Sequence, residues 1–219
     1  MPALLWLAVL VLGSAVAAYV LGHHCLGFNC NWRLLRHRAK VRRADTREDV
    51  TGAVVHGIDG SVLKEVDGWR TWLTQNNQGD KDWDWRLFLQ EAGLNAFLGW
   101  EYEAFTLKLD GKVGALMLLR TRGWHSRFPE DSSRIVYVEY LAAAPDARIH
   151  SSPRKYRYCG EAMLQFALHR SRNLGARGRI GLHSLPGAEE FYRRAGLHDF
   201  GPDLKEQGFR YFEMPGDRV

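Results

Sequence analysis

Cysteine is scarce in this chain, with only three in 219 residues. An odd and sparse set gives no disulfide framework, which agrees with a reducing compartment. His23, His24, Cys25 and Cys30 lie close together near the N-terminus, but no second pair of ligands at zinc spacing accompanies them. We therefore expect no metal site.

Other familiar patterns are missing too. The chain has neither the G-x-x-x-x-G-K-[ST] phosphate loop nor the G-x-G-x-x-G dinucleotide pattern. It shows no internal repeat and no low-complexity segment. Acidic side chains are absent from residues 1 to 43, which hold six of the basic ones. Because the whole chain has 30 Lys or Arg and 25 Asp or Glu, the remainder is close to neutral. The sequence pI near 9.2 is thus poor evidence for binding of nucleic acid, and we expect none.

Residues 3–21 form an uncharged run whose length as a helix, roughly 28 Å, would cross a hydrocarbon core. The basic cluster follows it, so the positive-inside rule predicts a membrane-anchored protein with its catalytic domain in the cytoplasm. A signal peptide cleaved near Ala15-Val16-Ala17 and a buried core helix are the alternatives. We expect an anchor at 1–24, a basic juxtamembrane segment and linker at 25–60, and a folded domain at 61–219.

Along the domain, residues 44–60 have the composition of a linker or of the domain's start. Two helices are expected next, one around Trp69 to Leu73 and one from Trp83 to Phe97. Their tryptophans are typical of core packing, and a pocket for an acceptor is the less favoured interpretation. Apolar and turn patterns then predict the remaining elements in order: strands at 104–109 and 112–119 around an Asp110-Gly111 turn, a strand at 135–143, a helix within 154–175, a strand at 179–184, a helix at 186–195 and a strand at 209–214. This order predicts a mixed α/β sheet with one parallel, right-handed crossover.

The segment 154–175 joins a basic loop to an amphipathic helix. Free backbone N–H groups at a helix start attract phosphate oxygens. Gly160 lets a ligand approach the backbone, Ala162 keeps the next inward position small, and Arg154, Lys155 and Arg157 add positive charge. An ordinary helix with a basic leading loop is the alternative.

Residues 157–162 read R-x-x-G-x-A and resemble the acyl-CoA pyrophosphate loop of the GNAT N-acetyltransferase superfamily. The hairpin at Asp110-Gly111, the strand reaching Pro145 and the segment SLPGAEEFYRRAGL at 184–197 are similar to other parts of that family, in the same order over residues 100–214. The resemblance implies a GNAT-like fold, a mixed sheet flanked by helices, here preceded by one N-terminal hydrophobic helix. It also implies binding of acetyl-CoA. The residues expected at the coenzyme are Leu141, Ala142, Ala143, Arg154, Lys155, Arg157, Tyr158, Cys159, Gly160, Glu161 and Ala162.

The loop 145–156 is longer than the family's usual connection. Arg148, Arg154 and Lys155 therefore have two interpretations, as ligands of the ribose 3′-phosphate or as a solvated run of charge. Arg157, Gly160 and Ala162 are not affected by the longer loop.

The chemistry of amine acylation requires a base and an acid. Glu139 is the one acid in an apolar strand, and burial would raise its pKa toward that of a general base. Pairing with an arginine is the alternative. Family resemblance implies Tyr192 as general acid for the leaving thiolate, with packing as its alternative role. Backbone N–H groups of Leu141 to Ala143 would hold the oxyanion. A Cys159 acyl carrier paired with His169 or His183 is disfavoured, because no partner is fixed by spacing.

The sequence thus predicts an acetyl-CoA-dependent N-acetyltransferase acting on a primary amine by direct attack. The acceptor is a small molecule or a protein, and the sequence does not select between them or give the oligomeric state. The alternative is a non-catalytic, membrane-tethered acyl-CoA-binding or regulatory domain. An aminoacyl-tRNA donor is disfavoured, because such a donor needs no diphosphate cradle.

Overall fold

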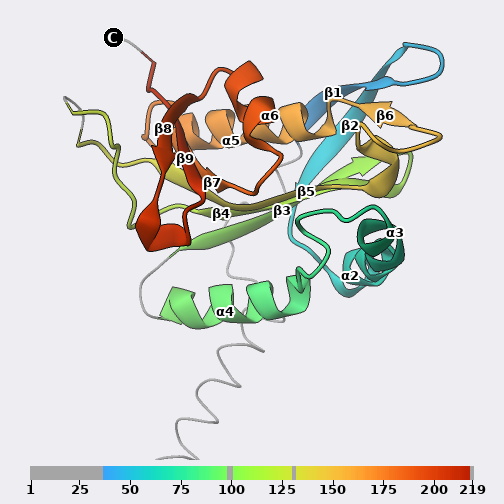
Figure 1. Cartoon of the computed structure of the whole chain (residues 1–219), viewed down its shortest axis with the longest axis horizontal. Helices are drawn as coiled ribbons and strands as arrows, with labels where there is room; N and C mark the ends of the chain where they lie inside the picture. The colour runs from blue at the N-terminus through green and yellow to red at the C-terminus, as the bar shows by residue number, and fades with distance from the viewer. Residues whose placement is uncertain (1–36, 98–100, 130–131, 218–219) are drawn as a thin grey trace, which may run out of the picture. The chain divides into compact units, whose positions relative to one another are not determined.

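A computed structural model describes residues 37–97, 101–129 and 132–217. Within these ranges the strands form one nine-stranded mixed sheet in the order β6-β1-β2-β3-β4-β5-β7-β9-β8 (Figure 1). All recorded strand pairs are antiparallel except β5 with β7. The strands are β1 (His37–Arg43), β2 (Asp49–His56), β3 (Tyr102–Leu109), β4 (Lys112–Arg120), β5 (Val136–Ala143), β6 (Tyr156–Arg157), β7 (Ile180–Ser184), β8 (His198–Pro202) and β9 (Arg210–Met214).

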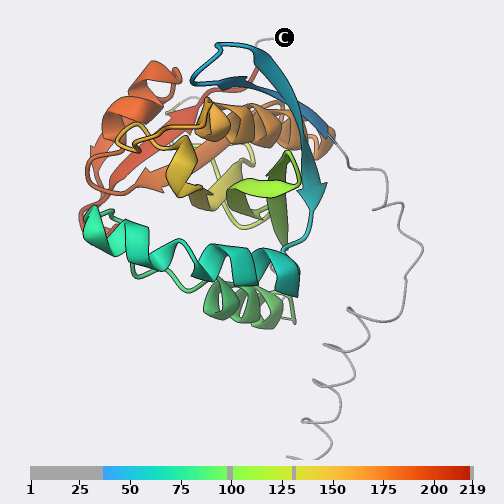
Figure 2. The same ribbon diagram turned by 90° about the vertical axis from the view of Figure 1, so that its right-hand side faces the viewer.

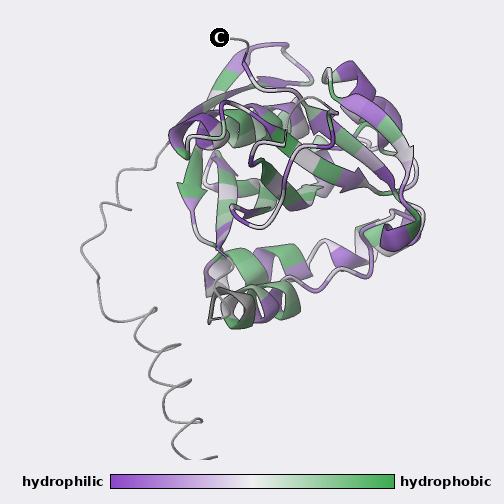
Figure 3. Ribbon diagram, turned by 90° about the vertical axis from the view of Figure 1, so that its left-hand side faces the viewer, coloured by the Kyte–Doolittle hydropathy of each residue, from purple (hydrophilic) through white to green (hydrophobic). Residues whose placement is uncertain are grey.

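Helices cover both faces of the sheet. Helices α5 and α6 lie on one face, and α2, α3 and α4 lie on the other (Figures 1 and 2). Each face has its own apolar core, and apolar residues concentrate on the strands and on the inner sides of the helices (Figure 3). The helices are α2 (Gly60–Asp67), α3 (Arg70–Gln75), α4 (Trp85–Phe97), α5 (Cys159–Asn173) and α6 (Glu189–Arg194), with short 3-10 turns η2 (Pro145–Ala147) and η3 (Leu204–Glu206).

The hairpin of β3 and β4 confirms the prediction from the Asp-Gly pair. Asp110 and Gly111 have φ values of 48° and 77°, which matches the left-handed geometry that a tight hairpin turn requires. The pairing continues to Tyr102 opposite Arg120. These two strands lie near the middle of the sheet and support its core.

Residues 37–56 form strands β1 and β2, so the domain begins before the boundary predicted at residue 61. In β1 only Ala39 and Val41 are buried, and the residues between and around them are charged. Arg43 pairs with Asp110 at 2.7 Å, so this part of the basic segment contributes to the fold. So short an alternation, surrounded by arginines, resembles a linker in the sequence.

The predicted membrane-anchored location is corrected here. No helix in the described ranges is long and apolar enough to cross a membrane. Helix α5 has 15 residues, about 22 Å at helical rise against a hydrocarbon core of about 30 Å. The predicted anchor at residues 3–21 and the His23, His24, Cys25, Cys30 cluster lie outside the described residues.

Candidate active site

The sheet opens between β5 and β7. These parallel strands pair only at Val136 with Ile180 and Tyr137 with Gly181, yet β5 continues to Ala143 and β7 to Ser184. Among the described residues, the edge of β5 beyond Tyr137 therefore has no neighbouring strand on that side. In an open α/β sheet, the carboxyl ends of diverging parallel strands are where ligands bind.

Helix α5 begins at this opening. Its N-cap residue, Tyr158, has a left-handed φ of 70° and makes no side-chain capping bond within the described part of the chain. The first turn therefore has backbone N–H groups that no N-cap side chain satisfies. Gly160 supports the close packing here, because a Cβ atom on it would lie 3.0 Å from the Phe191 ring of α6. The helix predicted within residues 154–175 is confirmed, and the phosphate cradle at its start stays a prediction.

The basic residues of the preceding loop differ in availability. Arg157 is exposed on β6. Arg154 uses its Nε atom to bind the carbonyl oxygens of Ala147 and Tyr156, and burial together with the nearby Arg157 lowers its pKa. Two guanidinium groups that repel each other at a helix start favour an anion.

Two other cations of this loop, Lys155 and Arg148, contact other parts of the protein. Lys155 lies 4.9 Å from the centre of the Tyr156 ring. Arg148 forms a buried, bidentate ion pair with Asp80 and donates from Nε to the carbonyl of Ala143 at 2.9 Å. Neither interpretation of Arg148 from sequence holds, because its guanidinium is engaged within the protein and is not a solvated charge.

Glu139 occupies an irregularity in β5. Tyr140 pairs with Leu118 and Val138 with Leu119, so Glu139 is the extra residue of a β-bulge. Its Oε2 atom is buried and has no hydrogen-bond partner among the described residues. Burial raises the pKa of this carboxyl group. A half-buried carboxylate with an unused oxygen has the properties required of a general base.

Tyr192 lies on α6 and is buried between Phe191 and Phe212. Burial, with a contribution from the charge of Asp80, raises the pKa of its phenol. The hydroxyl group therefore keeps its proton at neutral pH. Both predicted roles, acid and packing residue, agree with this environment.

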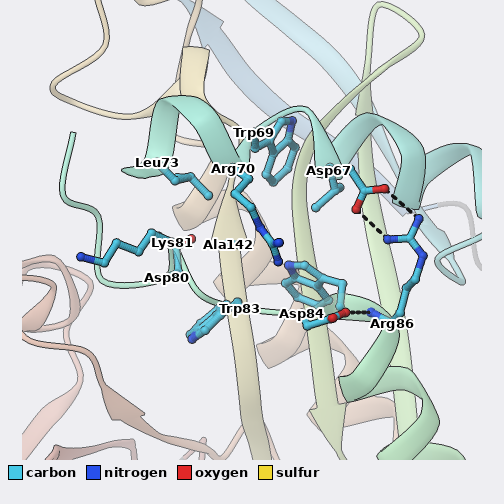
Figure 4. Close-up of a pocket in the computed structure, with 12 residues that line it drawn as sticks. Asp67, Trp69, Arg70, Leu73, Asp80, Lys81, Trp83, Asp84, Arg86 and Ala142 are labelled. Atoms are coloured by element: carbon cyan, nitrogen blue, oxygen red, sulfur yellow. Dashed lines mark hydrogen bonds and ion pairs between the residues drawn. The ribbon is translucent and has the colours of Figure 1, made fainter. Parts of the chain in front are cut away.

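A pocket of about 200 Å³ lies against β5 on the opposite face from α5 (Figure 4). In the sequence analysis, a pocket for an acceptor was the less favoured interpretation of the tryptophans. Arg70 points into the pocket, and Ala142 contributes from the strand (Figure 4). Its lining combines aromatic and charged side chains: Val66, Asp67, Trp69, Arg70, Leu73, Asp80, Lys81, Trp83, Asp84, Trp85, Arg86 and Ala142.

The predicted oxyanion residues divide between the two faces of β5. Leu141 and Ala143 pack against the core under α5, whereas Ala142 belongs to the core under α2 and α4. Their backbone edge is the part of β5 that β7 leaves uncovered. The carbonyl of Ala143 on this edge accepts the bond from Arg148.

Cys159 is not a candidate nucleophile. It is buried at the start of α5, and burial raises the pKa of its thiol to about 12. His183, one of the suggested partners, bonds to Tyr137 and Asp203 instead. No group of three His, Cys, Asp or Glu side chains suited to a metal ion occurs in the described ranges.

No family model matches the sequence, and no curated protein matches it. Among solved structures, the GNAT domain of S. lividans PAT is similar with a TM-score of 0.52 and 14% identity, over 86% of this chain and 99% of that one. The fold is a GNAT fold. A Bacillus subtilis N-acetyltransferase in complex with coenzyme A gives a TM-score of 0.49 at 14% identity, over 76% of this chain and 99% of that one. A GNAT-family acetyltransferase from Listeria monocytogenes gives 0.46 at 14% identity, over 80% and 98%.

At this level of identity the likeness concerns the fold alone. The described residues confirm the predicted mixed sheet. The predicted elements occur in the predicted order, and strands β1, β2, β6 and β8 are present in addition. The roles assigned to individual side chains depend on the geometry of this chain.

Proposed function

We propose that this protein is an N-acyltransferase that moves an acetyl group from acetyl-CoA to a primary amine by direct attack. The observation that carries the proposal is the bulge residue Glu139, with its buried, unused oxygen, on a strand whose free edge adjoins the start of α5. The GNAT fold and the coenzyme A held by the Bacillus subtilis neighbour support acetyl-CoA as donor.

The donor's diphosphate binds at the start of α5, on the N–H groups around Gly160 and beside Arg157 and Arg154. The pantetheine chain then follows the uncovered edge of β5, where the N–H groups of Leu141 and Ala143 face the thioester oxygen, while that of Ala142 is directed toward β4. No metal takes part in this scheme.

The reaction needs two proton transfers. Glu139 accepts a proton from the substrate ammonium, and the amine nitrogen attacks the thioester carbon. The carbon–sulfur bond breaks, and Tyr192 donates its proton to the leaving thiolate. Raised pKa values suit both groups, since Glu139 must gain a proton and Tyr192 must hold one until the thiolate forms.

The amine enters through the pocket beside Ala142. Trp83 lies next to Tyr140, the neighbour of Glu139 in the bulge, with their ring centres 5.0 Å apart. Aromatic faces attract an ammonium group. Both a small amine and a protein side chain or N-terminus fit this description.

A non-catalytic acyl-CoA-binding domain is the second candidate, and Arg148 favours it. The guanidinium group donates a hydrogen bond to the Ala143 carbonyl, on the edge of β5 along which we place acetyl-CoA. Such a domain would bind the coenzyme through Arg157 and the start of α5 without needing Glu139 or Tyr192.

To test this proposal, the full chain is titrated with acetyl-CoA by calorimetry. The release of free coenzyme A thiol is then followed with a panel of amines. We expect binding, amine-dependent thiol release, and a loss in kcat of about 100-fold in Glu139→Gln and in Tyr192→Phe. Glu190→Gln, an exposed change on α6, serves as control. Binding without release for any amine would favour the regulatory domain, and absence of binding would refute both.

A further inference from the structure

A chain of buried polar side chains lies beside Glu139 and has no role in the reaction described above. The Tyr137 hydroxyl lies 2.6 Å from Nδ1 of His183. The other ring nitrogen, Nε2, lies 3.2 Å from Oδ2 of Asp203. The side chains of His183 and Asp203 are only 6% and 10% exposed. Three titratable groups are therefore joined from strand β5 through β7 to the loop before η3.

The direction of these bonds follows from Asp203. Arg127 lies 2.5 Å from its carboxylate and lowers its pKa to about 2, so Asp203 accepts hydrogen bonds at neutral pH. His183 therefore carries its proton on Nε2, and Nδ1 is left to accept the hydroxyl proton of Tyr137. Burial lowers the pKa of His183, although Asp203 opposes this. The His183 ring is therefore neutral before it receives a proton, and the Asp203 carboxylate would stabilise the protonated form.

Glu139 lies at the other end of this chain. Val138 faces the core under α5, so Tyr137 and Glu139 both face the opposite side of the sheet. The negative charge of Glu206 raises the pKa values of Glu139, Tyr137 and His183. One surface carboxylate thus acts on all three groups. Arg120 and Glu91 also act on Glu139, and they lower and raise its pKa respectively.

The hydroxyl of Tyr137 is held in one direction. Its ring stacks on Trp124 with centres 4.0 Å apart and planes within 6°. On β7, Gly181 leaves room for Tyr211, whose hydroxyl would lie 2.4 Å from a Cβ atom there. Stacking on Trp124 and the hydrogen bond with His183 thus hold the Tyr137 side chain in place.

We propose that Tyr137, His183 and Asp203 form a proton path that returns Glu139 to its ionised state after each turnover. The path rests on the proposed function. The proton on Glu139 passes to the Tyr137 oxygen, directly or through one water, while the Tyr137 hydroxyl proton passes to Nδ1 of His183. Asp203 stabilises the resulting imidazolium until a solvent base removes one proton. Glu139 ends as a carboxylate, and Tyr137 and His183 end neutral.

Other charged and polar groups also face His183 and enter its titration. Glu206 favours the protonated ring and Arg127 opposes it, while the Tyr211 ring lies 5.0 Å away. Tyr137→Phe and His183→Gln keep these neighbours and remove the hydrogen bonds of the path. His169→Gln, on α5, removes a histidine from the other face of the sheet and serves as the control.

The first measurement needs no catalysis. In full-length protein with 13C-labelled glutamate carboxyl groups, the Glu139 signal, assigned with Glu139→Gln, is followed against pH. We expect its midpoint to move by about 0.5 pH units in Tyr137→Phe and in His183→Gln, and to stay in place in His169→Gln. Identical midpoints in all four proteins would overturn the path.

The second measurement is kcat against pH with an amine substrate. Each path variant should lose about 100-fold in kcat, and the double variant should lose no more than either alone. In a Glu139→Gln background neither change should lower kcat further. Independent, multiplying losses would overturn the path and indicate structural damage. Acetyl transfer with unmoved midpoints would overturn the path alone. If the wild type transfers no acetyl group while the midpoints move, the proposed function fails and the path loses its role in turnover.

Discussion

The buried pair of Arg148 and Asp80 allows a sharp test of how this site is built. We predict that Arg148→Met destabilises the fold without weakening the binding of acetyl-CoA. The guanidinium bonds to both oxygens of Asp80, to the Gln78 amide oxygen and to the Ala143 carbonyl. The side chains of the pair are 15% and 7% exposed.

The magnitude follows from what the substitution leaves behind. Methionine fills similar space but leaves the Asp80 carboxylate buried without its cation, and breaking a buried pair in this way costs about 3 to 5 kcal/mol. Because Asp80 also lines a pocket that water reaches, we expect about 3 kcal/mol, the lower end of that range. For a domain of this size that corresponds to a drop in Tm of about 6 to 12 °C.

The assay is urea unfolding followed by tryptophan fluorescence, combined with calorimetric titration of acetyl-CoA. The double variant Arg148→Met, Asp80→Leu should recover most of the lost stability, because no charge then remains unpaired. The affinity for acetyl-CoA should change by less than twofold in either protein. A large loss of affinity with little loss of stability would refute this reasoning and make Arg148 a ligand of the coenzyme.

Three further predictions concern the same domain. Arg157→Gln should weaken acetyl-CoA binding about tenfold, equal to about 1.4 kcal/mol, while the urea midpoint stays unchanged. Gly160→Val should lower the free energy of unfolding by about 1 to 3 kcal/mol, because the new side chain meets Phe191; equal urea midpoints would contradict this. Asp203 has a folded pKa of about 2, below its unfolded value, so its stabilisation is complete above about pH 4 and fades as the pH falls toward 2. The stability gap between wild type and Asp203→Asn should narrow over this range, and a constant gap in urea unfolding would argue against it.

Much of the fold was predictable because its local signals are strong. The Asp110-Gly111 turn fixed the hairpin, and the apolar run at β5 and the amphipathic stretch at α5 fixed the parallel crossover. Strands β1, β2, β6 and β8 were missed. The apolar residues of β1 and β8 are few, β2 lies in the stretch predicted as a linker or domain start, and β6 has only two residues. Their place in the sheet depends on partners far along the chain, which a local pattern does not contain.

The candidate site was predictable only in part. The helix start at Gly160 and the acid Glu139 followed from local pattern and resemblance. Arg148 was misread because its partner Asp80 lies 68 residues away, and a loop arginine with a distant carboxylate looks like a solvated charge. His183 was considered only as a partner of Cys159, although its strand position, next to the inward-facing Leu182, already placed it on the opposite face.

The bulge at Glu139 explains why these features occur together. In a regular strand Glu139 and Tyr140 would point to opposite faces, but Tyr140 stacks on Phe88 of α4 at 3.8 Å, on the same side as Glu139. The extra residue thus gives one face two consecutive side chains. One is the proposed base, and the other is an aromatic ring that packs against Trp83 and Trp85 of the pocket lining. Beyond it, Leu141 returns to the core under α5. Removing one residue here would turn every later side chain of β5 to the wrong face. The pocket residue Ala142, the proposed base and the proposed coenzyme edge therefore all depend on this single irregularity.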